Sequence, residues 1–241
     1  MSRRWLIKLD HVTISYKVDR NSRFLAGKRI FTPLSDVSLD VCEGEFLSVS
    51  GPNGSGKTSL IKVMSGVMAP FKGTVSWQAM NFGFVSQYQV LLPELTIREN
   101  ILLPFYLHDE RKKADGSPLE DDNPDEVLKR LDIYVKRFNI GEILEKHPNT
   151  CSIGQQQRAL LTRALAMDRD LIFADEPEQN LDSDGRMELF DSFKEANSAF
   201  GKTIVLVTQE HPEVLKQYAS RGIKIKGNNI VEIFRNGRVA G

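Results

Sequence analysis

The sequence predicts an α/β fold with a parallel sheet, a set of antiparallel strands and inserted helices. Two continuous apolar runs, residues 171–174 and 203–207, are typical of parallel strands that are buried on both faces. Residues 183–200 between them have helical spacing, so the three segments together predict a β–α–β crossover. Alternating apolar and polar residues near both ends of the chain predict further strands with one solvated face.

The first ninety residues are expected to form mostly short strands. In order, these strands are residues 5–16, 37–41, 45–50, 73–77 and 82–86. Residues 17–33 are basic and are expected to form a loop, whereas residues 59–64 have the composition of a short helix.

The middle of the chain changes from strands to helices. Thr96 and Glu99 form a capping-box pattern that predicts a helix from Ile97 to Leu107. Residues 109–122 are charged and contain glycine and proline, which predicts an exposed loop, and Asn123-Pro124 predicts the start of a second helix. Two antiparallel strands, residues 223–225 and 230–234, are expected near the end.

These elements predict a single domain in two parts. Residues 1–87 and 166–241 are expected to form an α/β core with antiparallel strands, and residues 88–165 a helical subdomain.

Composition excludes several classes of protein. Lys plus Arg number 32 and Asp plus Glu also number 32, so no net basic field suggests a nucleic-acid partner. Cys42 and Cys151 are far apart, which predicts free thiols rather than a disulfide framework or a metal cluster. No run approaches the ~18 apolar residues of a membrane span, so the chain is expected to be soluble by itself.

A glycine-rich stretch carries the strongest functional signal. Residues 51–58 match the phosphate-binding pattern G-x-x-x-x-G-K-[ST], between a predicted strand and a predicted helix. Lys57 is expected to neutralise the β- and γ-phosphates of a nucleoside triphosphate, and Thr58 to offer its hydroxyl to Mg²⁺. The residues expected to contact the nucleotide here are Gly51, Asn53, Gly54, Ser55, Gly56, Lys57, Thr58 and Ser59. The alternative is a glycine/serine turn that matches the pattern by chance.

Two adjacent acids end the apolar run at residues 171–174. Asp175 is expected to hold Mg²⁺ beside the phosphates, and Glu176 to polarise the attacking water. The alternative is that this pair caps the helix that follows Pro177.

A third motif, Cys151-Ser152-Ile153-Gly154-Gln155-Gln156-Gln157-Arg158, resembles the signature of the ATP-binding cassette (ABC) ATPases. The resemblance covers most of the chain and keeps the order of five motifs: the P-loop, Gln87, the signature, Asp175-Glu176 and Asn180-Leu181-Asp182. It implies a head-to-tail dimer in which the signature of one cassette closes over the ATP of the other. Ser152, Gly154 and Gln155 would then contact the nucleotide.

The resemblance also implies roles for isolated residues. Tyr16 would stack on the adenine, with Phe24 and Phe31 as alternatives and a core position as another. Gln87 would contact Mg²⁺ or the water, and Asp182 would lie in the loop that crosses the dimer interface.

Residues 84–100 are similar to the branch of the family that serves lipoprotein release, macrolide export and cell division. This likeness implies an ATPase subunit at the cytoplasmic face of the cell membrane that drives a separate permease. A lipid, a lipoprotein or another hydrophobic molecule is the implied cargo. The apolar segment at residues 88–95 is expected to contribute to a groove for a helix of the permease.

The chain departs from the family pattern in three places. Ile153 replaces the first signature glycine, and Glu178-Gln179 follow Pro177. Gln209 stands at the position of the family's switch histidine, with His211 two residues later as the alternative. These departures predict slow hydrolysis, and they leave open a subunit that is gated by nucleotide but barely hydrolyses it. A soluble cassette ATPase of the iron–sulfur assembly type is the other alternative.

Overall fold

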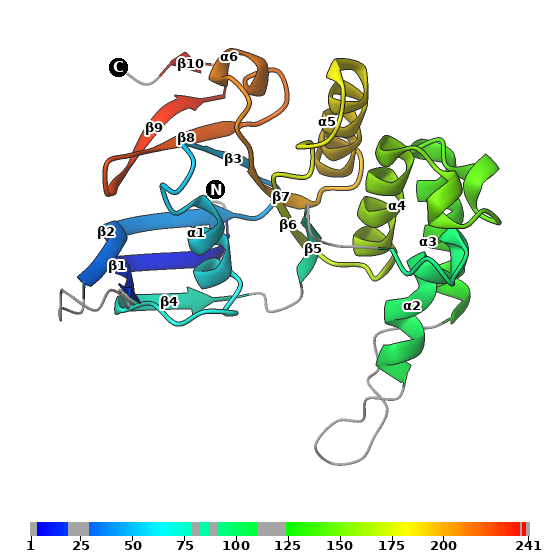
Figure 1. The fold of residues 1–241 in the computed structure, drawn as a ribbon, viewed down its shortest axis with the longest axis horizontal. Helices are drawn as coiled ribbons and strands as arrows, with labels where there is room; N and C mark the ends of the chain where they lie inside the picture. The colour runs from blue at the N-terminus through cyan, green and yellow to red at the C-terminus, as the bar shows by residue number, and fades with distance from the viewer. Residues whose placement is uncertain are drawn as a thin grey trace, which may run out of the picture. The chain divides into compact units, whose positions relative to one another are not determined.

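The computed structural model describes residues 4–18, 29–78, 82–86, 91–109, 124–236 and 238–239. Contacts divide the chain into two compact units (Figure 1). The first contains Met1–Met80 and Val205–Gly241, and the second contains Asn81–Ile204. Strand β7 (Thr203–Val207), which is fully buried, carries the chain from the second unit back to the first.

A three-stranded antiparallel sheet forms one layer of the first unit. Its order is β2 (Arg29–Cys42), β1 (Trp5–Val18) and β4 (Lys72–Trp77). The prediction of a loop over residues 17–33 was wrong at both ends, because Lys17 pairs with Ile30 and Val18 pairs with Arg29. Pairing between strands overrides a basic composition that favours a loop.

The second set of strands in this unit has the order β10-β9-β8-β3. Strand β3 (Phe46–Ser50) is parallel to β8 (Arg221–Lys226), which is antiparallel to β9 (Asn229–Arg235). The short strand β10 (Arg238–Val239) pairs with the end of β9. All five residues of β3 are buried, as its continuous apolar run predicts.

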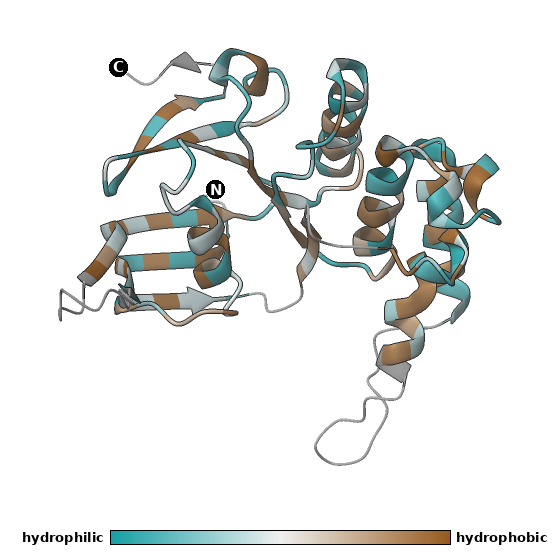
Figure 2. Ribbon diagram, viewed as in Figure 1, coloured by the Kyte–Doolittle hydropathy of each residue, from teal (hydrophilic) through white to brown (hydrophobic). Residues whose placement is uncertain are grey.

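Helix α1 (Lys57–Met64) contacts β1 and closes the core of the first unit. Its side chains Leu60, Ile61 and Val63 have no exposed surface. The indole nitrogen of Trp77 donates a hydrogen bond of 2.7 Å to the carbonyl of Met64, which ties β4 to the end of the helix. Figure 2 shows the matching alternation of apolar and polar residues along β1 and β2.

The second unit combines a pair of parallel strands with a group of helices. Strand β5 (Phe82–Ser86) pairs with β6 (Leu171–Asp175). Helix α4 (Ile153–Ala166) lies at the centre of the helical group and contacts other helices of this unit. These helices are α2 (Ile97–Asp109), α3 (Pro124–Arg137) and α5 (Ser183–Ser198) (Figure 1).

Local sequence signals placed several helix starts correctly. The backbone N–H of Thr96 donates to the Glu99 carboxylate at 2.7 Å, and the N–H of Glu99 donates back to the Thr96 hydroxyl at 3.2 Å. This is the predicted capping box. The α/β fold class is confirmed, while the division into a core and a helical subdomain at residues 88–165 stays a prediction. Among the described residues, no helix has both the length and the apolar character needed to cross a bilayer.

Candidate nucleotide-binding site

Glycine sets the shape of the loop between β3 and α1. Gly56 precedes the helix with a φ of 101°, and a Cβ at this position would lie 2.8 Å from the Cβ of Pro33. Gly51 has a φ of 152°, and a Cβ there would lie 2.9 Å from the Ser55 hydroxyl oxygen. A side chain at either position would meet both a strained backbone and a neighbouring atom. Contacts within the fold therefore hold the loop in this conformation.

The donors of the loop suit a phosphate group. The Lys57 side chain is 4% exposed, and its ammonium donates to the carbonyls of Gly51 at 3.0 Å and Pro52 at 3.2 Å. The Ser55 hydroxyl is buried and has no hydrogen-bond partner among the described residues. An anion at the start of α1, whose first turn contains no acidic residue, would satisfy this hydroxyl and meet the positive end of the helix dipole.

Thr58 and Ser59 follow Lys57 in the first turn of α1. Thr58 is exposed, so its hydroxyl can reach a metal ion beside the phosphates. Ser59 is half-buried and accepts a hydrogen bond of 2.7 Å from the hydroxyl of Tyr16. The predicted nucleotide contacts Tyr16 and Ser59 are therefore in direct contact with each other.

A hollow of about 730 Å³ opens beside the loop, at the carboxyl ends of β3 and β8. Its lining consists of residues 50–52, 209–212 and 224–227 with Val231 and Ile233. Both candidates for the switch position, Gln209 and His211, line it. His211 is the N-cap of α6 (Pro212–Leu215), and its Nδ1 accepts from the backbone N–H of Glu213 at 3.3 Å. The capping role that Pro212 predicts for His211 is thus present.

Asp175 and Glu176 lie at the end of β6 in the second unit. Asp175 is the last residue of the strand and is paired in register with Ser86 of β5. Glu176 has a φ of 46°, which is uncommon for a residue with a side chain and marks a constrained turn. Neither acid caps α5, because its N-cap is Asp182, whose carboxylate accepts from the N–H of Gly185 at 2.8 Å. The capping alternative for the acid pair is therefore wrong.

The signature motif forms the first turn of α4. The Ser152 hydroxyl accepts from the N–H of Gln155 at 3.2 Å, and the Gln155 side chain accepts from the N–H of Ser152 at 2.9 Å. Ile153 begins the helix and is 48% exposed. Ser152, Gly154 and Asp182 line one hollow of about 390 Å³ in this unit. The structure thus brings the signature and the Asn180-Leu181-Asp182 loop together.

Some residues that the sequence analysis singled out lie outside the described part of the chain, and others have surroundings that the sequence did not indicate. Gln87 lies outside the described residues, as do Phe24 and residues 88–90. Glu178, one of the two residues after Pro177 that depart from the family pattern, is 5% exposed. The described residues contain no group of three or more acidic, histidine or cysteine side chains that could hold a metal ion. Sequence analysis missed Pro33 as a contact of the loop, since no local pattern links it to Gly56.

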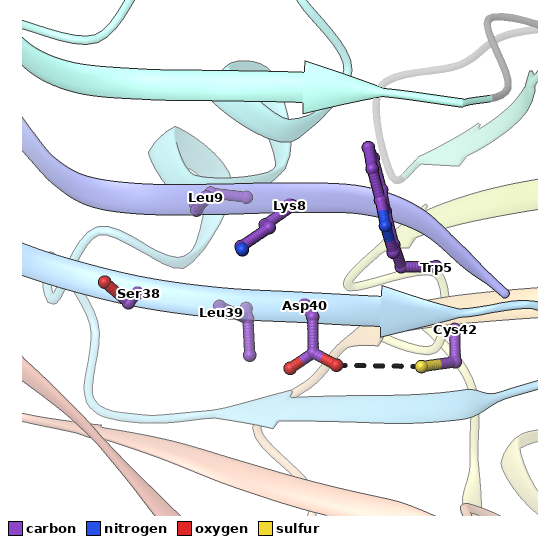
Figure 3. A pocket seen from close by; sticks show the side chains of 7 residues that line it. All are labelled: Trp5, Lys8, Leu9, Ser38, Leu39, Asp40 and Cys42. Carbon is purple, nitrogen blue, oxygen red and sulfur yellow. Dashed lines mark hydrogen bonds between the residues drawn. The ribbon is translucent and has the colours of Figure 1, made fainter. Parts of the chain in front are cut away.

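A further hollow of about 330 Å³ lies on β1 and β2 (Figure 3). Figure 3 shows the Cys42 thiol pointing toward Asp40, to which it donates at 3.6 Å. Burial raises the pKa of Cys42 above its usual value, with a smaller contribution from the Glu45 charge, so the reactive thiolate is disfavoured. No residue of the predicted motifs lines this hollow.

Comparison with known proteins decides the family. A family model described as ABC transporter matches residues 34–179. This chain belongs to the ABC transporter family. The uncharacterised ABC transporter ATP-binding protein MJ1508 of Methanocaldococcus jannaschii is 35% identical over 217 residues, which cover 83% of this chain and 90% of that protein. The lipoprotein-releasing system ATP-binding protein LolD of Aquifex aeolicus is 33% identical over 219 residues, or 84% of this chain and 91% of LolD.

Solved ABC cassettes have the same fold. The bacterial cassette MJ0796, solved as a dimer, superposes with a TM-score of 0.73 at 30% identity and covers 93% of this chain and 96% of its own. A post-hydrolysis dimer of the same cassette, bound to ADP and Pi, gives a TM-score of 0.72 at 29% identity, with 94% and 97% covered. The protein is therefore an ATP-binding subunit of the ABC transporter family, whose activity is ATP hydrolysis.

Proposed function

We propose that this cassette hydrolyses ATP at the interface of a dimer and drives a separate membrane permease from the cytoplasmic face. The single observation that carries the proposal is the P-loop, where a buried ammonium, an unsatisfied hydroxyl and a helix N-terminus converge on one place. The dimeric state of the MJ0796 structures supports the second cassette.

Several residues of the predicted motifs would act on the phosphates. Lys57 would neutralise the β- and γ-phosphates once it leaves the loop carbonyls that it contacts here. Thr58 and Asp175, with Gln87, would hold Mg²⁺, which when bound neutralises developing phosphate charge. Glu176 would orient the attacking water, since Asp175 would be engaged by the metal and the N-cap of α5 is Asp182 instead of Glu176.

The second cassette would complete the site. Ser152, Gly154 and Gln155 would face the ATP held by the P-loop of the partner, because Ser152 is the exposed N-cap of α4 and the half-buried Gly154 and Gln155 follow it in the first turn. Asp182 lines the same hollow and would lie in the loop that crosses the interface.

The 33% identity to LolD supports a hydrophobic cargo such as a lipid or lipoprotein. Residues 88–95 would form part of the permease groove. Leu91 is 2% exposed and packs inside the second unit, whereas Leu92 is 43% exposed and is open to a partner. Leu92→Glu should therefore weaken association with the permease while the fold is kept.

Gln209 and Ile153 favour a second candidate function, a subunit that binds ATP but turns it over slowly. A Gln side chain can donate hydrogen bonds through its amide but can neither carry a positive charge nor exchange a proton. Ile153 places an exposed apolar side chain where the family pattern has glycine.

The test combines affinity, turnover and co-purification. Purified full-length chain should bind Mg-ATP, and its hydrolysis should rise steeply with protein concentration because the site needs two cassettes. A tagged chain should retain an integral membrane protein from detergent-solubilised source membranes, and Leu92→Glu should reduce that recovery. Tight ATP binding without hydrolysis, even with the permease, would support the second candidate. Absence of any membrane protein would favour a soluble cassette ATPase.

A further inference from the structure

One face of the hairpin formed by β8 and β9, here called the β8–β9 face, is open and positively charged. Its exposed residues Lys224 and Lys226 line the hollow of about 730 Å³ beside the P-loop. Val231, which is paired in register with Lys224, is 46% exposed and lines the same hollow. Neither lysine forms an ion pair with another described residue. The hollow therefore offers two ammonium groups and an apolar side chain to a partner.

One carboxylate also lines this hollow. It belongs to Glu210, and it accepts a hydrogen bond of 2.8 Å from the backbone N–H of His211. Because this acid is engaged at the start of α6 and faces two lysines, the β8–β9 face keeps an excess of positive charge.

A stripe of negative charge runs along the first half of α5 and is here called the α5 stripe. Its exposed members, at spacings of three, four and seven residues that share one face of a helix, are Asp184, Met187, Glu188 and Asp191. Glu188 is paired with Arg158 of α4, and its side chain is still 62% exposed. Neither aspartate forms an ion pair with another described residue. The α5 stripe thus has an excess of carboxylates around one apolar side chain, that of Met187, which is 51% exposed.

The two surfaces match in charge, in spacing and in apolar content. Lys224 and Lys226, two positions apart on a strand, are separated by about 6.6 Å. Asp184 and Glu188, four positions apart on a helix, are separated by about 6 Å along its axis. Two ammonium groups can therefore meet two carboxylates when the helix lies along the strand, and each surface adds exposed apolar area beside its charges.

A second copy of this chain is the partner that these observations favour. Asp184 and Glu188 line the hollow that also contains Ser152 of the signature, and the two lysines line the hollow that contains Gly51 of the P-loop. In the proposed head-to-tail dimer the signature of one cassette approaches the P-loop of the other. The same approach brings the α5 stripe of one copy toward the β8–β9 face of its partner, and two-fold symmetry forms the contact twice.

We propose that this cassette forms a homodimer in which the α5 stripe of each copy docks on the β8–β9 face of its partner. The contact sets the choice of partner, because a cassette without an acidic stripe at this place would leave the two lysines uncompensated. The proposal deepens the proposed function and rests on its dimer, and it identifies the second cassette as another copy of this chain.

Charge reversal with mutual rescue tests the docking. The double variant Lys224→Glu and Lys226→Glu sets acid against acid, and the double variant Asp184→Lys and Asp191→Lys sets base against base. Each should self-associate at least about tenfold more weakly than wild type, because like charges oppose each other in both contacts of the dimer. Analytical ultracentrifugation with a Mg-bound non-hydrolysable ATP analogue measures the dissociation constant.

An equimolar mixture of the two double variants should dimerise again. In a mixed dimer one contact is the native one and the other has its charges reversed, so both contacts join opposite charges. The dissociation constant should return to within about threefold of wild type. Raising the salt concentration should weaken the wild-type dimer, because exposed charges are screened.

A control variant with the same change in net charge is Lys129→Glu with Lys136→Glu. Both lysines are exposed on α3, outside the two surfaces, so this variant should self-associate like wild type. Since every changed side chain is exposed, circular dichroism should show an unchanged fold for all variants.

The outcomes separate this docking from the proposed function. Double variants that self-associate like wild type, or a mixture that stays monomeric, would overturn the docking. A wild-type chain that binds ATP but does not self-associate, or that dimerises only with a different cassette, would overturn the homodimer and leave ATP binding intact. A wild-type chain that binds no Mg-ATP would refute the nucleotide site itself.

Discussion

The P-loop and the signature turn both precede a helix, yet they are built in different ways. The P-loop is braced from outside by Pro33, which packs on Gly56, and from within by the Lys57 ammonium, which donates to two carbonyls of the loop itself. The signature turn is held by local contacts, chiefly the reciprocal hydrogen bonds of Ser152 and Gln155, and it leaves Ile153 exposed.

This difference indicates which region can bind a ligand by itself and which needs a second surface to do so. A loop that is held in shape before the ligand arrives can bind phosphate with little reorganisation. An exposed turn with satisfied caps gains a ligand only when another surface is brought to it. We therefore expect changes in the P-loop to alter ATP affinity, and changes in the signature turn to alter turnover.

The largest effect should come from Glu176→Gln. Turnover should fall by about 10²–10³ because the water loses its orienting carboxylate, while ATP affinity stays near wild type. Nucleotide titration and a phosphate-release assay measure the two quantities, and an ATP-dependent dimer should accumulate in size-exclusion chromatography. Glu142→Gln, at an exposed site in the same unit, is the control. Wild-type turnover in Glu176→Gln would show that the catalytic carboxylate lies elsewhere.

Lys57→Ala should weaken ATP binding by about a hundredfold, because the phosphates lose charge-assisted hydrogen bonds from a buried ammonium. Isothermal titration with Mg-ATP measures the affinity. Lys62→Ala, an exposed lysine on the same helix, should bind like wild type. If both variants bound equally well, the preformed loop would not be the phosphate site.

Gln209→His should raise turnover by up to about tenfold, since part of a lost donor's contribution would return. His211→Ala should change turnover little, because its ring caps α6. Steady-state kinetics of both variants decide between them. A large loss with His211→Ala and no gain with Gln209→His would place the switch on His211.

The smallest effects concern stability at extreme pH in the second unit. Burial raises the pKa of Tyr134 from 10.0 to about 12, with a smaller contribution from the Asp168 charge. The folded state therefore favours the neutral phenol, and this contribution, present below pH 10, is lost as the pH rises toward about 12. Tyr134→Phe should lose less stability than wild type across that interval in urea titrations. Identical alkaline profiles would contradict the assignment.

The contribution of Asp168 to stability has the opposite dependence on pH. A hydrogen bond from Lys202 lowers its pKa below 3.8, so its stabilising contribution is present above that pH and is lost as the pH falls through the folded value. Because the carboxylate is more than half exposed, the effect should be small. Asp168→Asn should flatten the acid limb of the stability profile, whereas Asp170→Asn should have less effect, since Asp170 lies 3.7 Å from the same ammonium.

Local sequence was sufficient wherever the deciding contacts span only a few residues. The capping box at Thr96 and the buried apolar strands depend on neighbours along the chain, and the structure confirms both. The P-loop pattern is equally local, and its nucleotide contacts stay a prediction. The cap at His211 follows in the same way from the Pro212 beside it.

Tertiary structure decided what depends on residues far apart in the sequence. The early start of β2, the contact of Pro33 with Gly56 and the hydrogen bond from Tyr16 to Ser59 each join residues that are far apart along the chain, so no local sequence period predicts them. The exposure of Phe31 and the burial of Glu178 have the same origin. The sequence thus determined which chemical groups the candidate nucleotide site contains, whereas tertiary packing determined which of their neighbours are exposed and which are buried.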